Sequence, residues 1–139
     1  MPIYEEGDID LVNSQGYKSS VSVTRTADTN LYAALDVLGA ATGATAAMEF
    51  TNIGPSGGQI MITSATFERH ATALISGETS YNLELYSVTP PSALGDNAPW
   101  DLATGDRASH LGTISLGTPI DKVSTLKIDV DGINKHIQL

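Results

Sequence analysis

Residues 124–139, STLKIDVDGINKHIQL, decide the fold class of this chain. Apolar and polar residues alternate on both sides of the dipeptide Asp131-Gly132. An alternation of period two is typical of a strand with one buried face. Asp-Gly tolerates the positive φ of a tight turn, so between two such runs it is a strong signal for a β-hairpin. The stretch therefore predicts an antiparallel hairpin that turns at these two residues.

The same alternation recurs along most of the chain, with turn residues between the runs. GQIMITSATF is almost continuously apolar, which predicts a central, well-covered strand. Many short strands about ten residues apart predict an all-β, antiparallel β-sandwich or jelly-roll-like fold. The other runs are SVSVTRT (20–26), TAAMEFTNI (45–53), YNLELYSV (81–88) and SHLGTISL (109–116), beside GQIMITSATF (58–67).

Two segments depart from this pattern. Residues 1–19 are polar with scattered apolar positions, so we expect an extended N-terminal arm, with a disordered terminus as the alternative, before a single β-sandwich domain at 20–139. In residues 31–43, leucine and alanine at helical spacing indicate a short helix, while the β surroundings favour a strand followed by a loop. The sequence leaves both alternatives open for this second segment.

Composition limits the class of function. The 139 residues carry 7 Lys+Arg against 16 Asp+Glu, a formal charge of −9, which disfavours binding to a phosphate backbone. The absence of cysteine rules out disulfides and thiolate chemistry. The first residues lack the basic start and apolar run of a signal peptide, and no apolar run approaches a membrane-helix length of about 18 residues. We expect a protein made in cytoplasm that binds no nucleic acid and no membrane.

Residues with catalytic or metal-binding chemistry do not form a recognisable motif. Three loop aspartates could supply oxygen ligands for calcium, but their spacing matches no compact calcium loop, and turn chemistry explains them more simply. The three histidines lie in separate runs without zinc-ligand spacing. The segment GDRASH (105–110) contains Asp, Ser and His, but nucleophilic triads are assembled from different elements. We expect no enzyme activity, no metal and no cofactor. The aspartates and histidines are Asp96, Asp101, Asp106, His70, His110 and His136.

The long connection at 86–112 contains two prolines and the only tryptophan. Pro90 and Pro91 fix φ and stiffen the exit from the preceding strand. Trp100 can bury a large area against its own domain or against a neighbouring subunit, and we expect it to be mostly buried. The sequence thus predicts an ordered loop whose interaction residues include Pro90, Pro91 and Trp100.

Three stretches resemble a family of virion structural proteins encoded by tailed double-stranded DNA bacteriophages and prophages. They are FTNIGPSGGQIMITSATF (50–67), LELYSVTPPSALGDNAPWDLATGDRASHLGTISLGTPID (83–121) and VDGINKHIQL (130–139). The resemblance runs from about Val21 to the end. It implies a non-enzymatic, β-rich capsid decoration (cement) protein, commonly a homotrimer, that binds the major capsid protein on the outer surface of the head. Sequences of this type continue past the hairpin with another apolar segment, whereas this chain stops at Leu139. Either the protein is naturally short or its sheet is completed by a neighbour.

Two further expectations concern partners. The arm would bind the capsid or a neighbouring subunit by strand addition, with Ile3, Tyr4, Ile9 and Leu11 as apolar anchors. Its carboxylates would face basic residues of the shell, so attachment would weaken with salt. The alternative function is a head-fibre or tail adhesin, or a carbohydrate-binding β-sandwich module, which would need exposed aromatic side chains.

Overall fold

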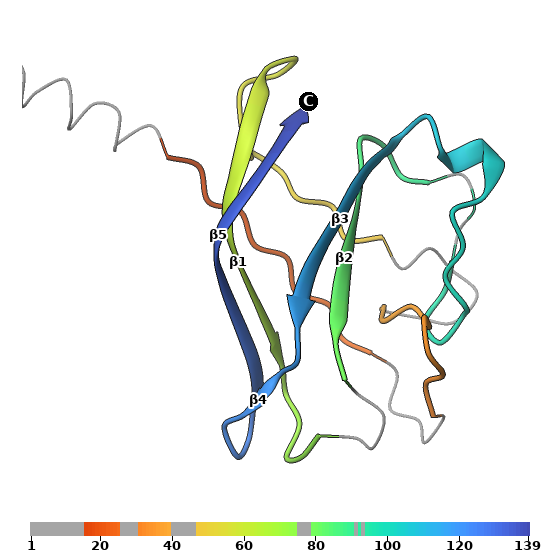
Figure 1. Cartoon of the computed structure of the whole chain (residues 1–139), viewed down its shortest axis with the longest axis vertical. Helices are drawn as coiled ribbons and strands as arrows, with labels where there is room; N and C mark the ends of the chain where they lie inside the picture. Colours follow the sequence, from red (N-terminus) through yellow and green to blue (C-terminus); the bar gives the residue numbers. More distant parts are fainter. Residues whose placement is uncertain (1–15, 26–30, 40–46, 75–78, 91, 93) are drawn as a thin grey trace, which may run out of the picture.

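The computed structural model describes residues 16–25, 31–39, 47–74, 79–90, 92 and 94–139. Its strands are β1 (Gln59–Arg69), β2 (Tyr81–Tyr86), β3 (His110–Gly117), β4 (Ile120–Asp121) and β5 (Leu126–Gln138). One short 3₁₀ helix, η1 (Thr104–Asp106), precedes β3. The strands form two small antiparallel sheets, shown side by side in Figure 1. The prediction of an all-β protein is thereby confirmed.

The first sheet has the strand order β1-β5-β4. Strand β5 runs without interruption through Asp131 and Gly132, so the predicted hairpin at these residues is wrong. The positive φ that Asp-Gly tolerates is used instead in a β-bulge, with Gly132 at φ 72° opposite a register shift between Ile62 and Ser64 of β1. The bulge lets both halves of β5 keep their apolar side chains on the same face of the sheet.

Among the described residues, strand β1 pairs only with β5 and so lies at the edge of their sheet. Within that part of the chain, the prediction of a central, well-covered strand is therefore wrong. Its side chains alternate between half-buried and exposed, and Met61 is 47% exposed. The nearly continuous apolar composition indicated a well-covered strand, but the described residues give β1 a partner on one side only, and its side chains are half-buried on one face and exposed on the other.

The second sheet pairs β2 with β3, with Leu83 opposite Ile114. Strand β3 also lies against β5. A Cβ atom at Gly112 would meet the ammonium group of Lys135, so the Lys135 side chain of β5 lies over Gly112 of β3. The small apolar core lies in this region and consists of Ile114, Leu126, Ile128 and Ile137.

Two further predicted strands are absent from the described residues. Residues 20–25 and 47–53 run as chain without regular strand structure, although their sequences alternate. In residues 31–39 the chain forms a turn with Leu35 at φ 71° and an isolated bridge between Asp36 and Pro99, so neither the helix nor the strand of the two alternatives forms there. Residues 40–43 of the same prediction lie outside the described residues. The described part of the chain contains no helix whose length and apolarity would let it span a bilayer.

Candidate functional site

Loop 87–109, which joins β2 to β3, is held against residues 31–39 by backbone hydrogen bonds. The amide of Val37 donates to the carbonyl of Ala98, and the amide of Asn97 donates to the carbonyl of Val37, both over 2.8 Å. The amide of Trp100 donates to the carbonyl of Leu35, also over 2.8 Å. These main-chain bonds order the loop. The sequence predicted an ordered loop from its prolines and tryptophan, and it did not predict these contacts.

Asp96 is the main side-chain anchor of this loop. It is 4% exposed, and its carboxylate accepts hydrogen bonds from Arg25, from the Tyr32 hydroxyl over 2.6 Å and from the Gly39 amide over 2.9 Å. The guanidinium of Arg25 reaches the carboxylate through Nε and through Nη2, the latter over 2.8 Å, and it also lies over the Tyr32 ring. Asp96 therefore ties three segments of the chain together.

The pKa of Asp96 follows from this environment. Burial raises the pKa of the carboxyl group, but the hydrogen bonds from Arg25, Tyr32 and Gly39 and the charge of Arg25 outweigh burial, so the pKa lies below its ordinary value. The carboxylate is accordingly charged at neutral pH. A buried, paired and charged Asp is a structural clamp, since its acceptor positions are occupied by donors of its own chain.

The other two aspartates of the loop have different environments from that of Asp96. Asp106 is 1% exposed and accepts a hydrogen bond from the Ser92 amide, whereas Asp101 is exposed. Within the described ranges, no three His, Cys, Asp or Glu side chains converge as a metal site. The hydroxyl of Ser109 donates to the backbone carbonyl of Asp106, so the GDRASH segment orders a turn rather than assembling a nucleophile.

A half-buried aromatic and polar cluster lies where the loop meets the second sheet. The indole nitrogen of Trp100 donates to the Tyr86 hydroxyl over 3.3 Å, and the Tyr86 and His110 rings lie 5.2 Å apart. His110 Nε2 is 2.9 Å from a Glu84 carboxylate oxygen, which also accepts from the Thr113 hydroxyl over 2.7 Å. Trp100 therefore packs within its own chain, but its exposure is intermediate rather than low.

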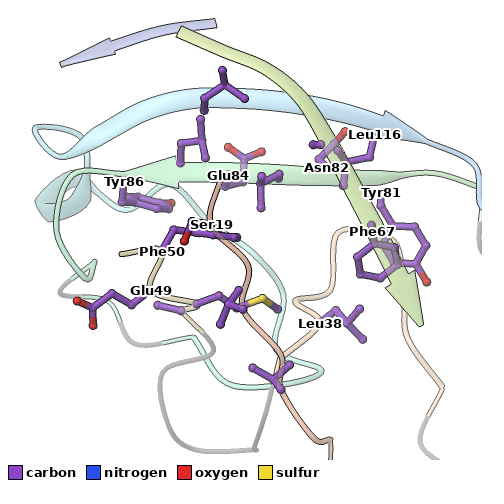
Figure 2. Close-up of a pocket in the computed structure, with 18 of the residues that line it drawn as sticks. Ser19, Leu38, Glu49, Phe50, Phe67, Tyr81, Asn82, Glu84, Tyr86 and Leu116 are labelled. Carbon is purple, nitrogen blue, oxygen red and sulfur yellow. The ribbon is translucent and has the colours of Figure 1, made fainter. Parts of the chain in front are cut away.

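A second feature is a hollow of about 3210 Å³ between the two sheets. Figure 2 shows its lining from several segments, with Phe67 of β1 and Tyr81 of β2 close together and Phe50 across the hollow. The Phe67 and Tyr81 rings are 4.8 Å apart, and Arg69 donates to the Tyr81 hydroxyl over 3.0 Å. Burial raises the pKa of the Tyr81 phenol, against the lowering effect of Arg69 and Arg25.

The size of this hollow argues against a small-molecule pocket. Pockets for small ligands measure about 300–1,000 Å³, several times less than this space. Its borders also include apolar side chains that are open to solvent, such as Phe50 at 37% and Val23 at 38% exposure. A hollow of this size, bordered by exposed apolar side chains, is better suited to a segment of polypeptide than to a metabolite.

The predicted interaction residues are only partly placed. Pro90 is half-buried and lines the hollow together with Trp100. The remaining predicted positions, Ile3, Tyr4, Ile9, Leu11 and Pro91, lie outside the described residues. The contacts of Asp96 were missed because its partners are 57 to 71 residues away in sequence and no local pattern links them.

Comparisons with protein-family models, with curated proteins and with solved structures each gave no match to this chain.

Proposed function

We propose that this protein is a non-enzymatic decoration (cement) protein of a tailed phage head. It binds the major capsid protein on the outside of the shell and stabilises the particle. The phage assignment rests on the sequence resemblance, and one structural observation supports an assembly role. Among the described residues, ten large apolar side chains are exposed while four apolar residues form the core. A chain with so much open apolar surface is suited to burial against other protein.

Such a protein would act as a homotrimer with a β-sandwich or jelly-roll-like arrangement of its two sheets. Open sheet edges favour pairing with other chains, and β1 exposes one edge along its whole length within the described residues. The net charge of −9 keeps such a protein away from the packaged DNA and suits the outer surface of the virion. Neither a cofactor nor a membrane enters this role, and the protein would be made in the host cytoplasm.

The test is reconstitution on heads of the phage that encodes the protein, prepared without it. Added protein should bind the heads saturably, appear as density on the outer surface and raise the temperature at which the heads release DNA. A chain lacking residues 2–19 should fold normally but fail to decorate, since the arm is proposed to make the attachment. Heads that take up no protein, or that show it only inside the shell, would refute the proposal.

A second candidate function is glycan binding by an adhesin. It is favoured by the cluster of Tyr86, Trp100 and His110, because aromatic rings beside a carboxylate and hydroxyl groups are a suitable surface for a sugar. A glycan array with the wild-type protein and Trp100→Ala distinguishes the two candidates. If the wild-type protein binds specific sugars and the variant does not, the result supports the adhesin. If the wild-type protein binds no glycan on the array, the decoration role is the better account.

A further inference from the structure

Residues 31–36, the leucine turn, present a run of apolar side chains to solvent. Leu31 is 79% exposed and Leu35 is 69% exposed. The two alanines between them, Ala33 and Ala34, are exposed as well. Single apolar residues are common on protein surfaces, whereas several neighbouring ones are typical of an interaction site. The leucine turn is therefore a candidate contact surface.

Contacts on several sides fix the main chain of this turn. The carbonyl of Leu35 accepts from the Trp100 amide over 2.8 Å, and the carboxylate of Asp36 accepts from the Ala33 amide. The Tyr32 hydroxyl donates to the buried carboxylate of the loop over 2.6 Å. In Figure 1 the turn (orange) lies beside loop 87–109, on the side of the molecule away from β1 and β5. The leucines are thus exposed on an anchored turn.

The backbone at Leu35 shows that its side chain is not there for the sake of the fold. Its φ is 71°, in the left-handed region that side chains other than those of asparagine and aspartate rarely adopt. Asparagine occupies two other such positions of this chain, Asn52 at 55° and Asn97 at 63°. Leucine at 35 brings backbone strain and little burial within the chain. Strain of this kind is typical of functional positions, so we infer that a partner uses the side chain.

The charges around the leucine turn indicate which partner it fits. Residues 31–39 and 94–101 contain aspartates but no lysine or arginine, and Arg25, which reaches this region, is paired with Asp96. A membrane surface with anionic lipids attracts basic segments, and a second copy would bring a further net charge of −9 to an acidic surface. An apolar pocket bordered by lysine or arginine on a different protein fits both the leucines and the carboxylates.

We propose that the leucine turn is a contact surface for the head shell, in addition to the N-terminal arm. Leu31 and Leu35 insert into an apolar pocket of the major capsid protein, and basic residues at the border of that pocket face Asp101, which is exposed. Removing the two side chains from water stabilises the complex. This contact rests on the proposed decoration function and identifies which described residues touch the shell.

The first test compares Leu35→Asn with Val123→Asn. The turn between β4 and β5, apart from the leucine turn in Figure 1, contains Val123, which also combines a positive φ of 78° with 77% exposure. Asparagine relieves backbone strain at both positions, so both variants should melt about 2–5 °C above the wild type. Leu35→Asn alone should lower the affinity for heads prepared without the protein, by about tenfold or more. A more stable variant that binds less well separates the contact from folding.

The wild-type protein distinguishes a failure of this contact from a failure of decoration. If the wild type does not bind heads, the decoration function is refuted and this contact with it. If the wild type binds and Leu35→Asn binds equally well, or Val123→Asn loses as much affinity, decoration stands and the leucine turn is not the contact.

Two control measurements address the other partners. Phosphatidylcholine vesicles with and without phosphatidylserine test lipid binding, and light scattering of the isolated protein tests self-association. Both results should be the same for the wild type and Leu35→Asn. Vesicle binding or self-association that Leu35→Asn loses would assign the turn to lipid or to a second copy, and would overturn the proposal.

A second test measures burial of the turn directly, and the absence of native cysteine allows a label to be placed at one position. Leu31→Cys carrying an environment-sensitive naphthalene dye should show blue-shifted emission when the protein saturates the heads. Val123→Cys with the same dye should keep the emission of the free protein. Unshifted emission from the Leu31→Cys label on saturated heads would show that the turn stays in solvent, which contradicts the proposed contact.

Discussion

At the scale of single residues, polar side chains anchor loop 87–109. Asp96 is the clearest case, because one buried carboxylate holds a guanidinium, a phenol and a backbone amide from two distant segments. Charged hydrogen bonds of this kind are roughly twice as strong as neutral ones. A loop built on them keeps its shape and can present a fixed surface to a partner.

Replacing Asp96 by Asn should therefore lower the free energy of unfolding by about 1.5–3 kcal/mol, since it removes charge-assisted hydrogen bonds and leaves Arg25 without its counter-charge. Asp101→Asn makes the same chemical change at an exposed position and should alter stability by less than about 0.5 kcal/mol. Urea unfolding of both variants at neutral pH provides the comparison. Equal stabilities would show that the Asp96 contacts do not hold the loop.

The low pKa of Asp96 also predicts a dependence of stability on pH. A carboxyl group whose pKa is depressed on folding stabilises the native state above its unfolded pKa of about 3.9, and this contribution is lost as pH falls through the lower folded pKa. The stability difference between wild type and Asp96→Asn should accordingly shrink from neutral pH towards pH 2. Unfolding curves at several pH values measure it, and a difference that stays constant would contradict the assigned ionisation.

Trp100 should contribute less than a core tryptophan, because it is only half-buried. We expect Trp100→Phe to cost about 1 kcal/mol through the lost hydrogen bond to Tyr86, and Trp100→Ala to cost about 2–3 kcal/mol, at or below the range of about 3–5 for a core site. A double-mutant cycle of Trp100→Phe with Tyr86→Phe isolates the bond. Additive losses would mean that the indole and the phenol do not interact.

At the scale of elements, β5 is one long strand because its bulge corrects the phase of the alternation. Asp131 and Gly132 are both exposed, and so are Thr63 and Ser64 opposite them, so the inward positions resume on the same face beyond the bulge. The strand keeps one apolar face over 13 residues. A turn at the same place would have folded the second half back on the first and removed the partner of β1.

The bulge predicts that replacing Gly132 by alanine lowers the free energy of unfolding. Nothing lies within 4 Å of a Cβ built there, so Gly132→Ala is opposed only by its φ of 72° and should lose about 1–2 kcal/mol. Gly105→Ala is the control, because it has equally open space and no positive φ, and it should change stability by less than about 0.5 kcal/mol. Thermal unfolding of the two variants compares them. Equal melting temperatures would show that the bulge is not the reason why glycine occupies position 132.

At the scale of the whole molecule, the described chain has little interior of its own. Four apolar residues are buried, and the sheets leave open edges and a wide hollow. A single 139-residue domain ordinarily buries most of the apolar surface that its unfolded chain exposes. The exposed apolar surface that remains is the reason why binding to other protein is central to the proposed function.

The corresponding prediction is a homotrimer in solution. Light scattering at micromolar concentration should give about three times the chain mass of 14.5 kDa, and dilution should lower the melting temperature because subunits that bind only folded partners stabilise by mass action. A chain that stays monomeric at every concentration, and whose melting temperature ignores dilution, would contradict it.

The sequence by itself determined the all-β class and the approximate places of β1, β2, β3 and β5, because alternation of period two depends on each residue and its near neighbours. It could not distinguish the hairpin at Asp131-Gly132 from a bulge, since both use the same positive φ. Only the tertiary structure decided that β1 is an edge strand, that residues 20–25 form no strand within the chain and that Asp96 binds Arg25. These features depend on pairing between segments that are far apart in the sequence. The local composition of a segment does not predict which distant segment will form its hydrogen bonds.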